Sequence, residues 1–111
     1  MGGQGMGDAV NVVQLVGRVS AVGSRANVPV GDVVVVRVVV PRPPRRARGT
    51  TADTIDVACW SVRARRGASR CTVGDEVEVE GSLRRRFLRA GGGVASRYEV
   101  EASAVKRRPA R

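Results

Sequence analysis

Arginine is the side chain that offers the most chemistry in this sequence. Lys and Arg together number 20 against 10 Asp and Glu, which leaves a formal net charge of +10 at pH 7. Nineteen of the 20 basic residues are Arg. A GC-rich codon bias explains Arg in place of Lys, but it does not explain the excess of positive charge. The composition therefore indicates a polyanionic partner, because guanidinium groups recognise phosphates by charge and by paired hydrogen bonds.

The residues needed for catalysis or for metal binding are scarce. The sequence has no His, so the common nucleophilic triads are unavailable. Asp53 and Asp56 differ by an odd number along a predicted strand, which points their side chains to opposite faces. Cys59 and Cys71 form no CxxC pair, and the glycines at 91–93 lack the Lys and Ser or Thr of a phosphate-binding loop. We expect no catalytic residue, no metal and no cofactor.

Two arginine clusters are the best candidates for contact with phosphates. One lies in 41–51, where three prolines and a glycine predict a mobile basic loop or hairpin tip. The other, 84–89, follows the run 76–81, in which Glu alternates with Val. That alternation predicts a strand with Val77 and Val79 facing a core and three Glu facing water. The change of sign suggests that one end of the sheet faces a nucleic acid.

The elements that must position these clusters are mostly strands. Alternation and β-branched residues predict five of them, at Asn11–Ser20, Val33–Val40, Asp53–Trp60, 76 onwards and Tyr98–Val105. Turns are expected at 27–32 and at 90–95. The segment 61–70 predicts a short helix capped by Ser61, and the arginines of this helix are typical of a solvated face. Five strands with a helix between the third and fourth predict an all-β fold, a closed OB-fold barrel.

The same alternation predicts which side chains form the core. The inward residues are Val13, Leu15 and Val19, then Ile55, Val57 and Cys59, and finally Tyr98, Val100, Ala102 and Ala104. The strand 33–40 is apolar on both faces apart from Arg37, so each side should be covered, with a second subunit as one candidate. One domain at 11–107 is expected, between a flexible Gly-rich segment 1–10 and a basic end 108–111. No run is long enough to span a bilayer.

The order and spacing of several motifs give a resemblance to a known family. The chain resembles the bacterial-type single-stranded DNA-binding proteins. The matching pieces are the segment 11–19, the turn that ends in Gly31, the strand closing on Trp60, the segment 74–84 and the segment 97–100. The resemblance covers about 11–106, and it implies an OB barrel that forms homodimers or homotetramers and binds single-stranded DNA without catalysis.

The resemblance also implies which residues contact DNA. Trp60 stands where the family carries an aromatic that stacks on a base, and the arginines of strands 2 and 4 stand where the family tracks the backbone. Three further stacking aromatics of the family correspond to Pro44, Thr54 and Leu88, although Phe87 neighbours the last. The expected nucleic-acid-binding residues are Trp60, Arg37, Arg42, Arg45, Arg46, Arg48, Arg84, Arg86, Phe87 and Leu88.

The three aromatic residues leave alternatives open. Trp60 is interpreted as a stacking residue or as an anchor in the core or a subunit interface, and Phe87 as a base contact or a core residue. Tyr98 shares its parity with apolar residues, so it is predicted to be structural. Parity places Arg84, Arg86 and Leu88 on the DNA side of their strand. With so few aromatics, charge should supply more of the affinity than stacking.

The predicted function is largely sequence-independent binding of single-stranded DNA in replication, recombination or repair. The family's acidic C-terminal tail is missing after Arg111, so the chain is expected to be a short, divergent or accessory member that meets any replication or repair proteins in another way. It is expected in the cytoplasm with the nucleoid, away from membranes. The alternatives are an OB-fold adaptor resembling primosomal replication protein B and an RNA-binding OB protein.

Overall fold

The computed structural model describes residues 7–27, 31–44, 49 and 51–109, and the side chains at 26, 27, 31 and 88–90 are outside this description. It contains five strands and one helix. These are β1 (Val13–Asn27), β2 (Gly31–Pro41), β3 (Ala52–Cys59), α1 (Val62–Ser69), β4 (Glu76–Ala90) and β5 (Gly93–Arg107). The element order therefore confirms the predicted one.

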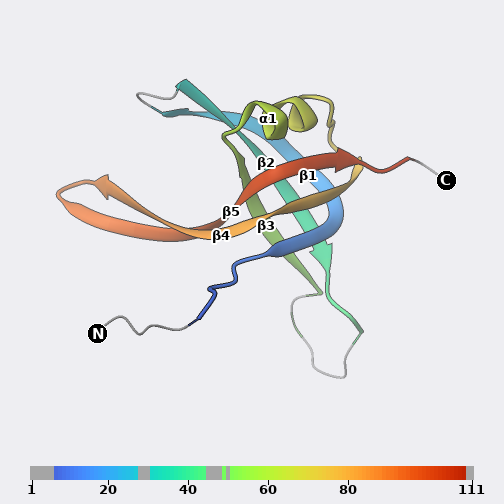
Figure 1. Cartoon of the computed structure of the whole chain (residues 1–111), viewed down its shortest axis with the longest axis horizontal. Coiled ribbons are helices and arrows are strands. Elements are labelled where there is room, and N and C mark those ends of the chain that lie inside the picture. The colour runs from blue at the N-terminus through green and yellow to red at the C-terminus, as the bar shows by residue number, and fades with distance from the viewer. Residues whose placement is uncertain (1–6, 28–30, 45–48, 50, 110–111) are drawn as a thin grey trace.

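The strands close into a barrel in the order β1-β2-β3-β5-β4 (Figure 1). Only β3 and β5 run parallel, and their pairing is short, with Val57 opposite Val100. The other neighbours are antiparallel and pair over longer stretches. A five-stranded barrel with its helix between β3 and β4 is an OB-fold, as predicted.

Valine and alanine fill the interior of the barrel. Val19, Val57, Val77 and Val79 are almost completely buried, and Val13, Leu15 and Ile55 pack against them. These are residues that alternation assigned to the core, so the prediction is confirmed for β1, β3 and the first half of β4. The strand β2 buries Val33, Val36 and Val38 fully and leaves its other valines partly buried. The second face of β2 is covered only in part within the described chain, because Arg37 is exposed between the partly buried Val35 and Val39.

Helix α1 covers one end of the barrel. The hydroxyl of Ser61 accepts a hydrogen bond from the Ala64 N–H at 3.1 Å, which caps the helix as the sequence predicts. Ala64 and Ala68 are fully buried, so the helix lies very close to the strands beneath it. The described part of the chain contains no helix long and apolar enough to cross a membrane.

Two hairpins continue past the barrel on the same side of the molecule (Figure 1). The strand β1 runs to Asn27 rather than stopping at Ser20, and β5 begins at Gly93 rather than at Tyr98. The tip of the β4–β5 hairpin is a tight turn, in which Gly91 and Gly92 have φ of 54° and 82°. Glycine adopts these angles without steric cost, so the strands pair up to the turn. The predicted flexible tip at 90–95 was too long.

The prediction that Tyr98 faces the core is wrong. Tyr98 does share its face with the buried Val100, but it lies where the ribbon has already left the barrel, and it is 63% exposed. Alternation along a strand gives the face of a side chain. It cannot give the point at which that face loses its cover.

Both cysteines are free and buried. Burial raises the pKa of the Cys59 thiol to about 12, and the neighbouring Cys71 adds to the effect. The thiol of Cys71 donates to the Gly67 carbonyl oxygen at 3.4 Å. Cys59 therefore behaves as a small apolar core residue, as its place on the predicted strand indicated.

Substituting Gly67 with Ala should destabilise the protein. A Cβ at this position would collide with the Val105 carbonyl oxygen of β5, and neither backbone can yield easily. Alanine normally favours a helix over glycine, so a loss of about 1–3 kcal/mol would show that the close packing outweighs propensity. Urea unfolding measures the difference.

The control is Gly23→Ala, because nothing lies within 4 Å of a Cβ there. Its free energy of unfolding should stay within about 0.5 kcal/mol of the original. Equal stability of the two variants would contradict the helix packing described above.

Candidate nucleic-acid interface

The two faces of the β4–β5 ribbon carry different chemistry. Residues directly opposite each other in the register share a face, and Arg84 pairs with Glu99 while Arg86 pairs with Arg97. We call this side, which also holds Glu101, the arginine face. The opposite side pairs Arg85 with Tyr98 and Phe87 with Ser96, and we call it the aromatic face. The predicted division of Arg84 and Arg86 from Arg85 and Phe87 is confirmed.

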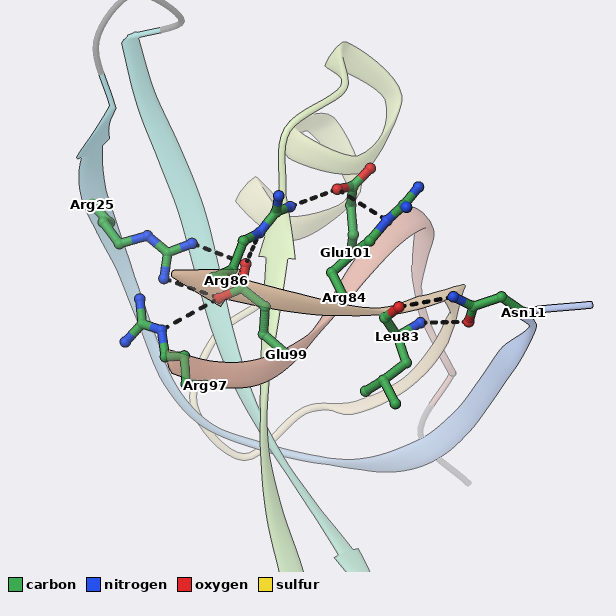
Figure 2. Close-up of polar contacts among 8 residues, drawn as sticks. All are labelled: Asn11, Arg25, Leu83, Arg84, Arg86, Arg97, Glu99 and Glu101. Atoms are coloured by element: carbon green, nitrogen blue, oxygen red, sulfur yellow. Dashed lines mark hydrogen bonds and ion pairs between the residues drawn. The ribbon is translucent and has the colours of Figure 1, made fainter. Parts of the chain in front are cut away.

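Glu99 is the centre of the arginine face (Figure 2). It is only 2% exposed, and three guanidinium groups surround it. Arg25 of β1 donates from Nη1 and Nη2 to its two carboxylate oxygens, both at 3.1 Å. Arg86 donates from Nε at 3.1 Å, and the Nε of Arg97 lies 3.7 Å from Oε1. One carboxylate thus ties the β1 arm to the β4–β5 ribbon.

Arg86 extends this cluster toward Trp60. Its Nη2 donates to Glu101 Oε1 at 2.6 Å, and its guanidinium carbon lies 4.9 Å from the centre of the Trp60 ring. Arg84 joins from 3.7 Å, again on Glu101 (Figure 2). Four guanidinium groups therefore share two carboxylates, and the cluster carries a net positive charge beside an aromatic ring.

The electrostatics of Glu99 follow from its partners. Burial alone would raise the pKa of Glu99, but hydrogen bonds from Arg25 and Arg86 outweigh burial and hold the pKa below its ordinary value. The carboxylate therefore stays ionised to a lower pH than an ordinary glutamate does. Its function in the fold is to fix guanidinium groups in place, since each bound guanidinium keeps further N–H donors for another acceptor.

The arginine cluster joins two hollows of the surface. One lies along β1, β2 and β3 and includes Arg25, Arg37 and Arg97 in its lining. The other lies beside Trp60 and includes Glu101. Since Glu99 and Glu101 hold the arginines between them, we treat both hollows and the cluster as one surface, the arginine groove.

Trp60 is half-buried at the edge of this groove. Its Nε1–H is buried and has no hydrogen-bond partner within the described part of the chain. The indole is therefore held by its stacking under Arg86 and by apolar packing, with no polar anchor. This arrangement leaves both interpretations of Trp60 physically possible, because a ring packed on one side can still accept a base on another.

Two predicted phosphate contacts are ion-paired within the protein. Arg37 Nε lies 3.0 Å from Asp56, and Arg42 Nη2 lies 2.7 Å from Asp53. The hydrogen bond from Arg42 also lowers the pKa of Asp53. Both pairs are exposed, and pairs of this kind contribute little to stability. They reduce the positive charge that these two arginines present.

The other predicted site residues divide into three groups. Arg84 and Arg86 lie on the arginine face, together with Trp60 at its edge. Phe87 lies on the aromatic face and is exposed, so the core interpretation of Phe87 is wrong. Arg45, Arg46 and Arg48 lie outside the described residues, and so does the side chain of Leu88.

Sequence reasoning missed Arg25, Arg97 and Glu99. Arg25 stands in a stretch of small and polar residues with no apolar alternation, so no strand was predicted there. Its ion pair with Glu99 joins residues 74 positions apart. Glu99 alternates with the predicted inward residues Tyr98 and Val100, so the sequence placed it on the outer face and gave no signal of its burial.

Many solved structures are similar to this chain, two single-stranded DNA-binding proteins among them. One is Plasmodium falciparum SSB in complex with ssDNA, with a TM-score of 0.72, 16% sequence identity and coverage of 92% of this chain and 97% of that chain. The other is a small single-stranded DNA-binding protein from Streptomyces coelicolor, with a TM-score of 0.62, 22% identity and coverage of 87% and 93%. No protein-family model and no curated protein matches the chain. The similarity establishes the fold that these proteins share.

Replacing Glu99 with Gln should destabilise the protein by about 2 kcal/mol at neutral pH, because charged hydrogen bonds to Arg25 and Arg86 become neutral ones. The folded pKa of Glu99 lies below its ordinary value of 4.5, so its contribution is complete above that pH and is lost as the pH falls through the folded pKa. The difference between the two proteins should therefore shrink in acid. Thermal and urea unfolding between neutral and acidic pH measure it.

Glu80→Gln is the matched control, since Glu80 is exposed and its carboxylate has no ion pair among the described residues. This variant should unfold like the original protein at every pH. A Glu99→Gln protein that is equally stable would remove Glu99 from its central place in the cluster.

Proposed function

We propose that this protein binds single-stranded DNA along the arginine groove, without catalysis and with little preference for base sequence. The observation that carries the proposal is the cluster in which four guanidinium groups share two carboxylates beside Trp60. The fold supports it, because the two similar structures named above are of single-stranded DNA-binding proteins. A function in replication, recombination or repair follows from such binding.

Preorganisation explains how this cluster would bind phosphates. Glu99 and Glu101 hold the arginines in place before the ligand arrives, so less side-chain entropy is lost on binding. Arg84 and Arg97 are the most available, with side chains 52% and 40% exposed. They approach the carboxylates to 3.7 Å and make no hydrogen bond with them. The Nε of Arg97 is itself buried, so the Nη donors of Arg97 and the guanidinium of Arg84 are the groups open to phosphate oxygens.

Single strands suit this surface better than a duplex does. An unpaired base can enter the hollow beside Trp60, while its phosphate reaches the neighbouring arginines. Contacts to phosphates and to the face of a ring do not distinguish the four bases. The expected binding is therefore tolerant of sequence and sensitive to salt.

The double variant Arg84→Gln/Arg97→Gln should weaken binding to oligo-dT and reduce its salt dependence. For single strands, the slope of log K against log salt changes by roughly 0.7 for each phosphate contact, so two lost contacts should lower it by about 1.4. The hydrogen bonds of Arg25 and Arg86 to Glu99 remain, which protects the fold. Fluorescence anisotropy over a range of NaCl concentrations measures both quantities.

Arg65→Gln/Arg66→Gln on α1 removes the same charge from residues that do not line the groove, and it should leave the slope nearly unchanged. If this control matched the groove variant, overall charge would explain binding and the groove would not. If the original protein bound no oligo-dT while capturing protein partners after nuclease treatment, the adaptor function would replace the proposal. If the protein preferred RNA over DNA oligonucleotides in a competition assay, its proposed ligand would be RNA.

Trp60→Ala should weaken the binding of oligo-dT by about 1–3 kcal/mol, the usual value of one base stacked on one ring. Trp60 is the only tryptophan, so its fluorescence should be quenched when DNA binds. If DNA does not quench the fluorescence of Trp60 and the Trp60→Ala variant binds with unchanged affinity, Trp60 only supports the structure of the groove. Circular dichroism of the variant checks that it is folded.

A further inference from the structure

The aromatic face of the β4–β5 ribbon gathers two exposed rings around one arginine. Phe87 and Tyr98 are 65% and 63% exposed, although rings of this size are usually buried. The guanidinium carbon of Arg85 lies 4.9 Å from the centre of the Phe87 ring and 5.6 Å from that of Tyr98. Arg85 also donates to the Ser96 hydroxyl at 3.3 Å. The three side chains thus form one cation–aromatic cluster.

Arg85 differs from its neighbours on the other side of the ribbon in having no acidic partner. Arg84 and Arg86 are paired with Glu101, and Arg86 also with Glu99, but Arg85 has no ion pair with any described residue. The register explains this, because the two glutamates of β5, Glu99 and Glu101, project to the arginine face. The aromatic face therefore keeps its full positive charge next to two rings.

We infer that the aromatic face is a second stacking surface for single-stranded DNA, distinct from the arginine groove. The inference rests on the proposed function and extends it to the other side of the same ribbon. Phe87 and Tyr98 would stack on bases, and Arg85 would hold the phosphate between them. Unpaired DNA is the ligand class that presents a π face and an anion at each repeating unit.

A protein partner fits this surface less well. An apolar interface here would bury the Arg85 guanidinium without a carboxylate from this chain, which is costly. A second copy of the ribbon packed face to face would bring two unpaired guanidiniums together. A phosphate instead neutralises Arg85 while the rings keep their contact with it.

The two binding surfaces predict a dependence on the length of the DNA. Since they lie on opposite faces of one hairpin, a strand must pass around the ribbon to occupy both. A short oligo-dT fills the groove alone, whereas a longer one reaches the aromatic face as well. Changes to Phe87 and Tyr98 should therefore affect long oligonucleotides and leave short ones unchanged.

The double variant Phe87→Leu/Tyr98→Leu tests this inference, because it keeps apolar side chains on the surface and removes both π systems. Affinity for a long oligo-dT should fall by about 5-fold or more for each ring lost. Trp60 should still be quenched at saturating DNA, because the groove is intact. Arg85→Gln should lower the salt slope by about 0.7 on long DNA only. Sedimentation velocity of the free protein should not change.

Val94→Ala is the matched control, since Val94 is an exposed aliphatic residue on the same face near the hairpin tip. It should bind long oligo-dT like the original protein. If the double variant binds long oligo-dT with unchanged affinity, the inference is overturned. The proposed function is then still tested separately by Trp60→Ala, which changes only the groove. A lower sedimentation coefficient of the double variant would overturn it in favour of self-association. Failure of the original protein to bind any oligo-dT would instead overturn the proposed function itself.

Discussion

A single buried carboxylate determines how the functional surface is organised. Glu99 cannot remain ionised in the protein interior without cationic partners, and the ones it has come from β1, β4 and β5. The hydrogen bonds of Arg25 to both of its oxygens hold the β1 arm against the β4–β5 ribbon, so two hairpins that leave the barrel keep a defined relation. The shape of the arginine groove between them depends on this contact. A buried acid thus organises the excess of positive charge in this sequence.

The distribution of aromatic side chains supports a binding function on the surface. The barrel interior is built from valine, alanine and cysteine, and it uses none of the three aromatic residues. Trp60 lies under Arg86, while Phe87 and Tyr98 lie next to Arg85. Each ring therefore meets a guanidinium at or near the surface. Rings placed in this way combine stacking with charge, which gives stacking more weight than the low aromatic content of the sequence indicated.

Local patterns in the sequence predicted the barrel well, because alternation and capping act over a few residues. Val77 and Val79 face the core, and Ser61 caps α1, for reasons visible within short windows. The errors arose where distant segments meet. The second half of β1 carries no apolar alternation, since only β2 pairs with it there, and Tyr98 is exposed because the ribbon has passed the barrel. Arg25 and Glu99 are joined only by the closed fold, so their pairing could not be predicted from spacing.

We propose that the arginine groove, and not positive charge in general, contacts the DNA phosphates. This contact is tested most directly by NMR of the assigned arginine Nε–H signals during titration with oligo-dT. The signals of Arg84 and Arg97 should shift and broaden in step with DNA binding, while those of Arg65 and Arg66 on α1 stay in place. Movement of the helix signals with unchanged groove signals would show that the DNA binds to the helix and not to the groove.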